Sequence, residues 1–278
     1  MPPIEIRPRR ATELVDASFQ LLRRFYPQFI TVSAMAMAPG LVLRIIKRDQ
    51  MTDPTEMLRH PETLFLLSFV SWVLIVVAST ILTVAVSDAY LTGEVDIERA
   101  FRVAGRKALT VFGGQLLRFV TIMAFTFVLI LIGGIFTAVH AQIILILLVP
   151  LAMWVFAYLW LRSFAVSQAI LLEDLGPVDA NYRSWRLSKD CAAHLFYSVS
   201  IVIVLSWAVN LVVAVLAATM LTQSTAAILG SVAFVFIYPL FSTVWTLVYY
   251  DLRIRKEGFD LEIMSRELGT DTAPVPAV

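Results

Sequence analysis

The sequence predicts an all-α membrane protein: a polytopic helical bundle of six transmembrane helices in three hairpins, with short interfacial amphipathic helices. Hydrophobic residues make up 59% of the chain and charged residues 15%, whereas globular domains contain about 45–50% and about 25%. The apolar residues are gathered in six runs, each near or above the ~18 residues that a helix needs to cross a bilayer core. Basic residues lie mainly between alternate runs, as expected when those connections share one side of a membrane.

The six runs are residues 29–46, 63–86, 119–139, 143–166, 195–221 and 226–250. The first is the shortest, contains Pro39 and Gly40, and reaches its length only by including Arg44, whose charge would have to snorkel to the interface. Whether this run crosses the membrane completely stays open. The predicted organisation is a cytoplasmic segment with an amphipathic helix over 1–28, a six-helix membrane domain over 29–258 and a partly disordered cytoplasmic tail over 259–278.

Basic residues determine the predicted orientation. Of the 22 Lys and Arg residues, those that fall around the connection between the first two runs are Arg44, Lys47, Arg48 and Arg59. The others lie in the N-terminal segment, in the second-to-third and fourth-to-fifth connections, and in the tail. Because connections rich in Lys and Arg stay cytoplasmic, we predict a multi-pass protein of the cell membrane with both termini cytoplasmic. The dispersal of the basic residues along four segments argues against nucleic-acid binding.

Three cytoplasmic segments share a pattern, and each precedes a pair of apolar runs: residues 13–26, 95–109 and 178–191. In each segment a small residue is followed directly by an aromatic residue, and an aliphatic residue stands two positions after the aromatic one. The small residues are Ser18, Ala100 and Ser184, the aromatic ones Phe19, Phe101 and Trp185, and the aliphatic ones Leu21, Val103 and Leu187. We interpret this as a threefold repeat of one short helix plus one hairpin. The alternative is that any loop between membrane spans contains aromatic residues and arginines.

These short helices are expected to lie in the membrane interface with their apolar faces toward lipid. In the third, Trp185 would lie at headgroup depth, while Arg183 and Arg186 would contact anionic headgroups. The lipid bilayer is therefore the first predicted partner. The alternative is a simple topology signal, in which arginine and lysine are interchangeable and the tryptophan is dispensable.

The last apolar run ends in the stretch "VYYDLRIRKEGFDLE", and we predict that its helix continues about two turns beyond Tyr250. Tyr250 would mark the membrane interface, where amphipathic rings settle. Two oppositely charged pairs then recur at a spacing of four residues: Asp251 with Arg255, and Arg253 with Glu257. Only a helix brings residues at this spacing together, and we expect both pairs to be exposed.

The end of this helix is predicted at Gly258, since glycine commonly supplies the left-handed residue that follows a helix. Arg255 and Lys256 would occupy the last turn, where the helix dipole favours cations. We favour a topology lock as the role of this helix end: its cations would fix the side of the membrane, and Gly258 would cap the helix. A recognition surface for a partner is the alternative.

Three segments of the chain resemble a known family: "YRSWRLSKD", "YYDLRIRKEGFDLE" and "RPRRATELVDASFQLLRRFY". They look like the corresponding parts of the glycerophosphoryl diester phosphodiesterase membrane-domain family, which is common in bacteria, and the resemblance covers residues 7–262. The family name comes from members whose membrane domain is fused to a soluble, metal-dependent phosphodiesterase barrel. The resemblance implies a stand-alone membrane domain here, without that catalytic barrel.

The residues themselves offer no convergent catalytic or metal-binding group. The three histidines, His60, His140 and His194, are assigned to different loops. The Gly113–Gly114 pair lies at the start of an apolar helix, where close helix packing explains it better than a phosphate-binding loop. We therefore predict that the protein is not an enzyme and has no cofactor.

The interior of the membrane runs is poor in polar residues. The runs contain no Asp or Glu, which argues against a proton relay. What remains is Asn210, scattered Ser and Thr, and Arg118 and Arg162 near cytoplasmic ends. We expect Asn210 to form an interhelical hydrogen bond.

Two functions are compatible with this sequence. The first is a non-catalytic membrane scaffold whose cytoplasmic helices recruit a membrane protein partner or a second copy of the chain. The second is a small transporter or channel for a lipid-like or amphiphilic solute. A wet cavity at mid-membrane depth would favour transport, and a filled core would favour the scaffold. We place the scaffold first.

Overall fold

The computed structural model describes residues 7–47, 58–138, 143–220 and 223–267. All regular secondary structure in these ranges is helical, which confirms the all-α fold. The helices are α1 (Ala11–Ile46), α3 (Pro61–Leu91), α4 (Ile97–Ala138), α5 (Ile143–Arg162), α6 (Val166–Leu172), α7 (Pro177–Ser188), α8 (Ala192–Met220), α9 (Gln223–Glu257) and α10 (Phe259–Glu267). Within the described ranges, six stretches are long and apolar enough to cross a membrane, as in a multi-pass integral membrane protein.

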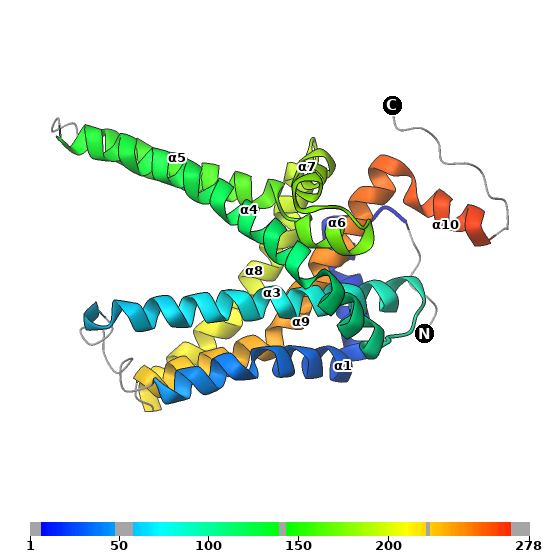
Figure 1. Cartoon of the computed structure of the whole chain (residues 1–278), viewed down its shortest axis with the longest axis horizontal. Helices are drawn as coiled ribbons and strands as arrows, with labels where there is room; N and C mark the ends of the chain where they lie inside the picture. The colour runs from blue at the N-terminus through cyan, green and yellow to red at the C-terminus, as the bar shows by residue number, and fades with distance from the viewer. Residues whose placement is uncertain (1–6, 48–57, 139–142, 221–222, 268–278) are drawn as a thin grey trace.

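The helices fall into two groups that diverge like the arms of a V (Figure 1). One arm holds α1, α3, α8 and α9, the other holds α4 and α5, and α6 and α7 lie where the arms meet. Three predicted hairpins are present, since α1 packs on α3, α4 on α5, and α8 on α9. α1 also packs along α9, so the first and last long helices are neighbours.

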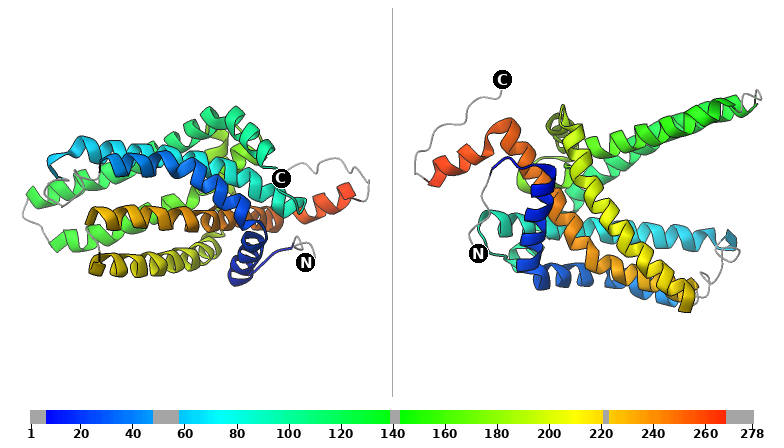
Figure 2. Two further views of the ribbon diagram at one scale, coloured as in Figure 1. Left: turned by 90° about the horizontal axis from the view of Figure 1, so that it is seen from below. Right: turned by 180° about the vertical axis from the view of Figure 1, so that it is seen from behind.

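α1 contains the predicted N-terminal amphipathic helix and the first apolar run in one element, bent at Phe25 (φ −114°, ψ 18°). Pro27 follows two residues later, and a proline that lacks a backbone donor and crowds the preceding turn accounts for the bend. Figure 2 shows the N-terminal part turned away from the rest of α1. Its apolar face is buried in the protein, because Leu14 and Leu21 are both 1% exposed. The prediction that this face lies against lipid is therefore wrong for the first segment.

α4 joins the second amphipathic segment to the third apolar run in a single helix, so the predicted short interfacial helix is not separate here. The Asp96 carboxylate caps its start, accepting a hydrogen bond from Arg99 N at 2.8 Å. Further along, a Cβ on Gly114 would lie 2.7 Å from Ile170 Cδ1 of α6. Gly114, the second residue of the Gly113–Gly114 pair, thus allows α4 and α6 to pack closely, in agreement with the packing role predicted for the pair.

The fourth apolar run is broken after Arg162, and a turn leads into the buried helix α6. A serine of α7 satisfies the backbone at the break. The Ser184 hydroxyl accepts a hydrogen bond from Ala165 N at 3.0 Å and donates one to Arg162 O at 2.9 Å. Because buried backbone groups need partners, this hydroxyl stabilises the turn. The sequence predicts one continuous helix over 143–166 and does not indicate the separate helix α6.

Candidate functional site

The predicted repeat has a counterpart in side-chain burial. The small residues of the three segments are all fully buried: Ser18, Ala100 and Ser184 are each 0% exposed. The aromatic residues that follow them reach the surface of three different helices, α1, α4 and α7. Phe19 is 39% and Phe101 37% exposed, and Trp185 is half-buried. The repeat therefore describes how each segment packs, and its aromatic residues lie on separate helices.

Arg183 of α7, predicted to reach anionic lipid, is buried among carboxylates instead. Its Nε donates to Glu173 Oε2 at 2.7 Å, and its Nη2 donates to Glu257 Oε2 at 2.7 Å. Burial by itself would lower the pKa of the guanidinium, but the hydrogen bonds and charges of Glu257 and Glu173 outweigh burial and raise this pKa. The prediction failed because Arg183 shares a helix face with the buried Leu187, four residues on.

Glu173, which follows α6, binds further donors. The Tyr249 hydroxyl donates to Glu173 Oε1, and Arg253 Nε lies 3.7 Å from the same oxygen. Arg253 also lies 3.3 Å from Glu257 Oε2. We call this set the carboxylate clamp: Glu173, Arg183, Tyr249, Arg253 and Glu257. Arg253 Nη2 also lies 3.9 Å from Glu262 Oε2 of α10. The carboxylate clamp therefore joins α7 and the loop that follows α6 to the end of α9, where its two arginines offset the charge of its two glutamates.

The predicted end of the last membrane helix is confirmed. α9 ends at Glu257, and Gly258 follows with φ +64°, the left-handed conformation that glycine adopts without strain. Both predicted pairs at a spacing of four are present. Arg255 Nε lies 2.7 Å from Asp251 Oδ2, and the pair of Arg253 with Glu257 belongs to the carboxylate clamp.

The cytoplasmic end of α9 is more buried than predicted. Tyr250 is 2% exposed, and its hydroxyl lies 2.6 Å from Ser87 Oγ of α3, so it packs inside the protein rather than at a lipid interface. Asp251 is 3% exposed, accepts a hydrogen bond from Arg9 N at 2.7 Å, and lies 2.8 Å from His194 Nε2 of α8. Asp251 therefore links the N-terminal segment, α8 and α9, and the prediction of an exposed pair is wrong.

The ends of α7 and α9 carry the three remaining predicted contact residues, Trp185, Arg186 and Lys256. Lys256 Nζ donates to Arg186 O at 3.4 Å and to Lys189 O, so it meets the last carbonyls of α7, where the helix dipole favours a cation. The Arg162 guanidinium lies 5.0 Å from the centroid of the Trp185 ring. The Arg186 side chain is exposed. A headgroup contact by Trp185 and Arg186 stays a prediction.

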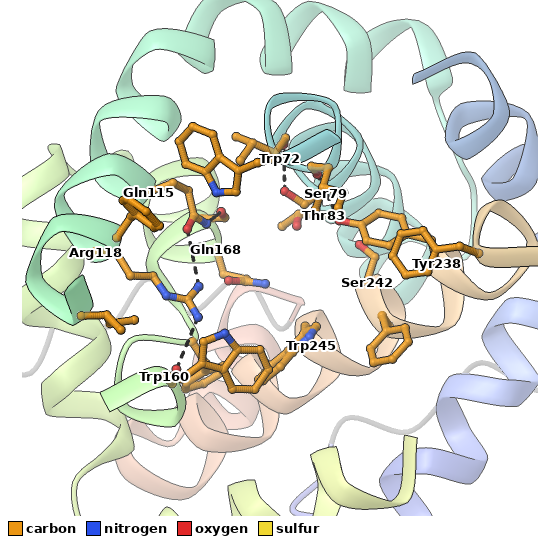
Figure 3. A pocket seen from close by; sticks show the side chains of 18 of the residues that line it. Trp72, Ser79, Thr83, Gln115, Arg118, Trp160, Gln168, Tyr238, Ser242 and Trp245 are labelled. Carbon is orange, nitrogen blue, oxygen red and sulfur yellow. Dashed lines mark hydrogen bonds between the residues drawn. The ribbon is translucent and has the colours of Figure 1, made fainter. Parts of the chain in front are cut away.

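A cavity of about 460 Å³ lies between the two arms, beside α6 (Figure 3). Residues of α3, α4, α5, α6 and α9 line it, and most of them are aromatic or aliphatic, including Trp72, Trp160 and Trp245. The polar residues of the lining are Ser79, Thr83, Gln115, Arg118, Ser167, Gln168, Tyr238 and Ser242. Small-molecule sites are typically about 300–1,000 Å³, mostly apolar with a few placed polar groups. The cavity fits this description.

Arg118 of α4 brings a charge into this lining. Its Nη1 lies 3.5 Å from Gln115 Oε1 and its Nη2 lies 3.4 Å from Trp160 O, both long for hydrogen bonds. The guanidinium also lies 5.6 Å from the Trp160 ring centroid. Among the residues that the structure describes, no Asp or Glu forms an ion pair with Arg118. The cavity therefore holds a cation without a bound counterion from those residues.

Two buried polar atoms of the cavity have no hydrogen-bond partner in the described part of the chain, Gln168 Oε1 and Ser242 Oγ. Both residues are 5% exposed. Figure 3 shows Arg118 and Ser242 on opposite sides of the cavity, with Gln168 between them. Gln115 Nε2 donates to Ser167 Oγ at 2.7 Å, which connects α4 to α6. An unsatisfied buried polar atom costs about 1–3 kcal/mol. A ligand that formed hydrogen bonds with these two atoms would therefore bind more tightly.

Arg118 also lines a second cavity, of about 310 Å³, together with Asn181, Tyr182 and Trp185 of α7. Tyr182 is 72% exposed, so this second cavity borders the outer face of α7. Arg118 is thus shared between a cavity at the surface of α7 and the cavity between the arms.

The sequence predicts an intramembrane polar contact at Asn210 instead. Asn210 donates to Ser206 O at 2.8 Å, one turn back in the same helix, and the predicted interhelical bond is not formed within the described part of the chain. Gln115 and Gln168 were missed because both fall just outside the apolar runs. The signal that would have found the first is its spacing, since Gln115 and Arg118 lie on one helix face at i, i+3.

Within the described ranges, no group of three or more His, Cys, Asp or Glu side chains is placed to hold a metal ion. No protein-family model, curated protein or solved structure matches this chain. The resemblance to the glycerophosphoryl diester phosphodiesterase membrane-domain family therefore stays a prediction from the sequence.

Proposed function

We propose that this protein is a small transporter for a lipid-like amphiphile, which it binds in the cavity between the arms. The cavity of about 460 Å³, with Arg118 and several other polar residues in a mostly apolar lining, carries the proposal. A scaffold is the first hypothesis from the sequence, and a wet cavity at mid-membrane depth would favour transport instead. The cavity is lined by α3, α4, α5 and α9, all of which contain candidate membrane spans, so we place transport first.

An amphiphile fits the access to the cavity. Three residues line the cavity and also belong to the exposed apolar surface: Phe119 is 49%, Met123 38% and Phe156 45% exposed. Apolar surface of this kind on membrane-spanning helices faces lipid. A lipid-like molecule would therefore move laterally from the bilayer into the cavity, with its chain along these residues and its polar group near Arg118.

The test compares two phenylalanine substitutions on α3. Ser79 lines the cavity, whereas Ser68 is an exposed residue of the same helix outside that lining. The full chain is purified from membranes in a mild detergent, and the amphiphiles it retains are extracted and counted by mass spectrometry. Ser79→Phe should lower the retained amount at least tenfold, because the added ring fills the cavity, and Ser68→Phe should not.

Transport itself is measured with the wild-type chain in proteoliposomes that contain a fluorescent lipid. We expect the labelled lipid to exchange between leaflets faster than in protein-free vesicles, and Ser79→Phe to remove the difference. Equal retention and equal exchange by both variants would contradict the proposal.

The proposal includes no catalytic step and no cofactor. It places the protein in the cell membrane with both termini cytoplasmic, which the distribution of Lys and Arg supports. Reporter fusions at each end test this orientation, and a terminus found outside would contradict it.

Partner recruitment is the second candidate function, favoured by α10. This helix projects from the end of α9 (Figure 1), and its Leu261 is 67% exposed. A membrane protein partner that docks on α10 should be lost on Leu261→Asp in native-membrane crosslinking. Unchanged crosslinks would leave α10 without a recruiting role.

A further inference from the structure

We infer that the amphiphile has a headgroup with one negative charge and a hydroxyl, and that Arg118 binds the acidic group while Gln168 and Ser242 bind the hydroxyl. This inference rests on the proposed function and names the substrate class of the same cavity. It follows from the charge of the lining, from two unpaired polar atoms and from the arrangement of the aromatic walls.

The charge of the lining favours an anion. Within the described residues, the hydrogen-bonding contacts of Arg118 are the long ones to Gln115 and Trp160, and the described lining contains no Asp or Glu. Arg118 is half-buried, and a charge withdrawn from water is stabilised when it is paired and hydrogen-bonded. One guanidinium matches one phosphodiester or carboxylate, which it binds in a bidentate manner. A second negative charge would find no further cation in this lining.

A zwitterionic headgroup fits less well. Its ammonium group would need a carboxylate, which the lining does not supply, or an aromatic face. The Trp160 ring already has the Arg118 guanidinium 5.6 Å from its centroid. The Trp245 ring packs on both Trp160 and Phe164, with centroids 5.2 Å and 5.6 Å away. At the Trp160 ring, a second cation would therefore lie close to Arg118 and be repelled by it.

The unpaired atoms favour a hydroxyl. Gln168 Oε1 can only accept a hydrogen bond, so its missing partner must be a donor. Ser242 Oγ can both donate and accept. A headgroup with a hydroxyl can donate a hydrogen bond to Gln168 Oε1, and it can donate to or accept from Ser242 Oγ. An acidic group without hydroxyls would pair with Arg118 and leave Gln168 unsatisfied.

The experiment uses four probes on the full chain in a neutral detergent, with binding followed by native mass spectrometry. Phosphatidylglycerol carries one negative charge and hydroxyls, phosphatidylmethanol the same charge without a hydroxyl, and phosphatidylcholine no net charge, all with the same acyl chains. Free glycerophosphoglycerol, the deacylated form of phosphatidylglycerol with the same single charge, tests the headgroup alone. We expect phosphatidylglycerol to bind at least tenfold more tightly than phosphatidylcholine, phosphatidylmethanol to fall between them, and glycerophosphoglycerol not to compete.

Three variants assign the effect to residues. Arg118→Gln should bring phosphatidylglycerol within twofold of phosphatidylcholine, while Arg106→Gln, an exposed residue of the same helix, should keep the preference. Gln168→Leu should remove the advantage of phosphatidylglycerol over phosphatidylmethanol but keep that of both over phosphatidylcholine. Arg118→Lys retains the charge and should retain a reduced preference, which provides a readout if Arg118→Gln does not accumulate.

The outcomes separate this inference from the proposed function. If wild-type protein binds the lipids equally and Ser79→Phe still abolishes binding, the anionic hydroxyl headgroup is wrong and the cavity remains a lipid site. Competition by glycerophosphoglycerol would show that the acyl chains are not recognised and would overturn the lipid as ligand. If no lipid binds, or Ser79→Phe has no effect on binding, the proposed function fails and the inference fails with it.

Discussion

Arg183 on α7 donates to both carboxylate oxygens of Glu257 at the end of α9, although 74 positions separate the two residues in the chain. Such a two-point contact fixes the relative orientation of its partners as well as their distance. Because Arg183 also binds Glu173, the carboxylate clamp holds α7 and the loop after α6 against α9. α7 in turn supplies Ser184 to the broken backbone after α5. The clamp thus supports the region beside the cavity.

Arg183→Gln should destabilise the protein by about 3 kcal/mol, because it removes the more closely bound of the two cations that Glu173 and Glu257 share and leaves only Arg253, at 3.7 Å and 3.3 Å, in a poorly hydrated site. The free energy of unfolding is measured by denaturant titration in detergent. Arg186→Gln, an exposed change on the same helix, is the matched control and should stay within about 0.5 kcal/mol of wild type. Equal stability of the two variants would show that the clamp contributes nothing.

Exchanging the charges of Asp251 and Arg255 should lower the melting temperature strongly. If the two residues only paired with each other, Asp251→Arg with Arg255→Asp would be tolerated. However, Asp251 is 3% exposed, accepts a hydrogen bond from Arg9 N and lies beside His194. An arginine there would face the backbone N–H of Arg9, which cannot accept a hydrogen bond from it.

A surface pair on α4 provides the control for this exchange. Glu98 and Arg102 also form a pair at a spacing of four, with side chains 84% and 58% exposed. Glu98→Arg with Arg102→Glu should leave the melting temperature unchanged, since exposed pairs contribute little. If the exchange of Asp251 and Arg255 changes the melting temperature no more than the exchange of Glu98 and Arg102, the links of Asp251 to the N-terminal segment and α8 are dispensable.

The parts of the fold that depend on local sequence were predictable. Helix spans follow from the length of apolar runs, and the end of α9 follows from charges at a spacing of four and a glycine behind them. Gly258 is in the left-handed conformation predicted for it. Close packing at Gly114 was predictable for the same reason, because a glycine in an apolar helix most often marks a close approach.

The parts that depend on tertiary contacts were not predictable. Whether Arg183 meets lipid or carboxylates depends on Glu257, 74 positions away, and no local pattern contains that information. The break after Arg162 depends on a hydroxyl of α7. The cavity arises because α4 and α5 diverge from the other helices (Figure 1), so residues just outside the apolar runs, such as Gln168, become part of its lining.

Gly258→Ala and Gly105→Ala should change stability in opposite directions. Gly258 has φ +64°, where an added Cβ costs about 1–2 kcal/mol. Gly105 lies in α4, and a Cβ there would have no heavy atom within 4 Å in the described structure. Alanine should therefore stabilise that helix by about 0.5–1 kcal/mol. Both values come from denaturant titration, and a stabilising Gly258→Ala would rule out the left-handed helix end.

Gly114→Ala should destabilise the protein by about 1–3 kcal/mol and also weaken lipid binding. A Cβ there would lie 2.7 Å from Ile170 Cδ1 and 3.0 Å from Val166 Cγ1, both on α6. The Ile170 side chain must therefore rotate or α6 must shift away from α4, and α6 carries Gln168 into the cavity. Lipid retention measured by native mass spectrometry should fall along with stability.

The neighbouring glycine and a compensating change distinguish this steric cause from a general effect of alanine. A Cβ on Gly113 would lie 3.5 Å from Pro177 Cγ, an ordinary van der Waals distance, so Gly113→Ala should be tolerated in both measurements. Ile170→Val removes the Cδ1 atom that Gly114→Ala would strike. The double variant Gly114→Ala with Ile170→Val should therefore be more stable than the two separate losses add up to, and recover part of the lipid retention. Additive losses would mean that α4 and α6 do not meet at these atoms, and that the position of Gln168 does not depend on the absence of a side chain at Gly114.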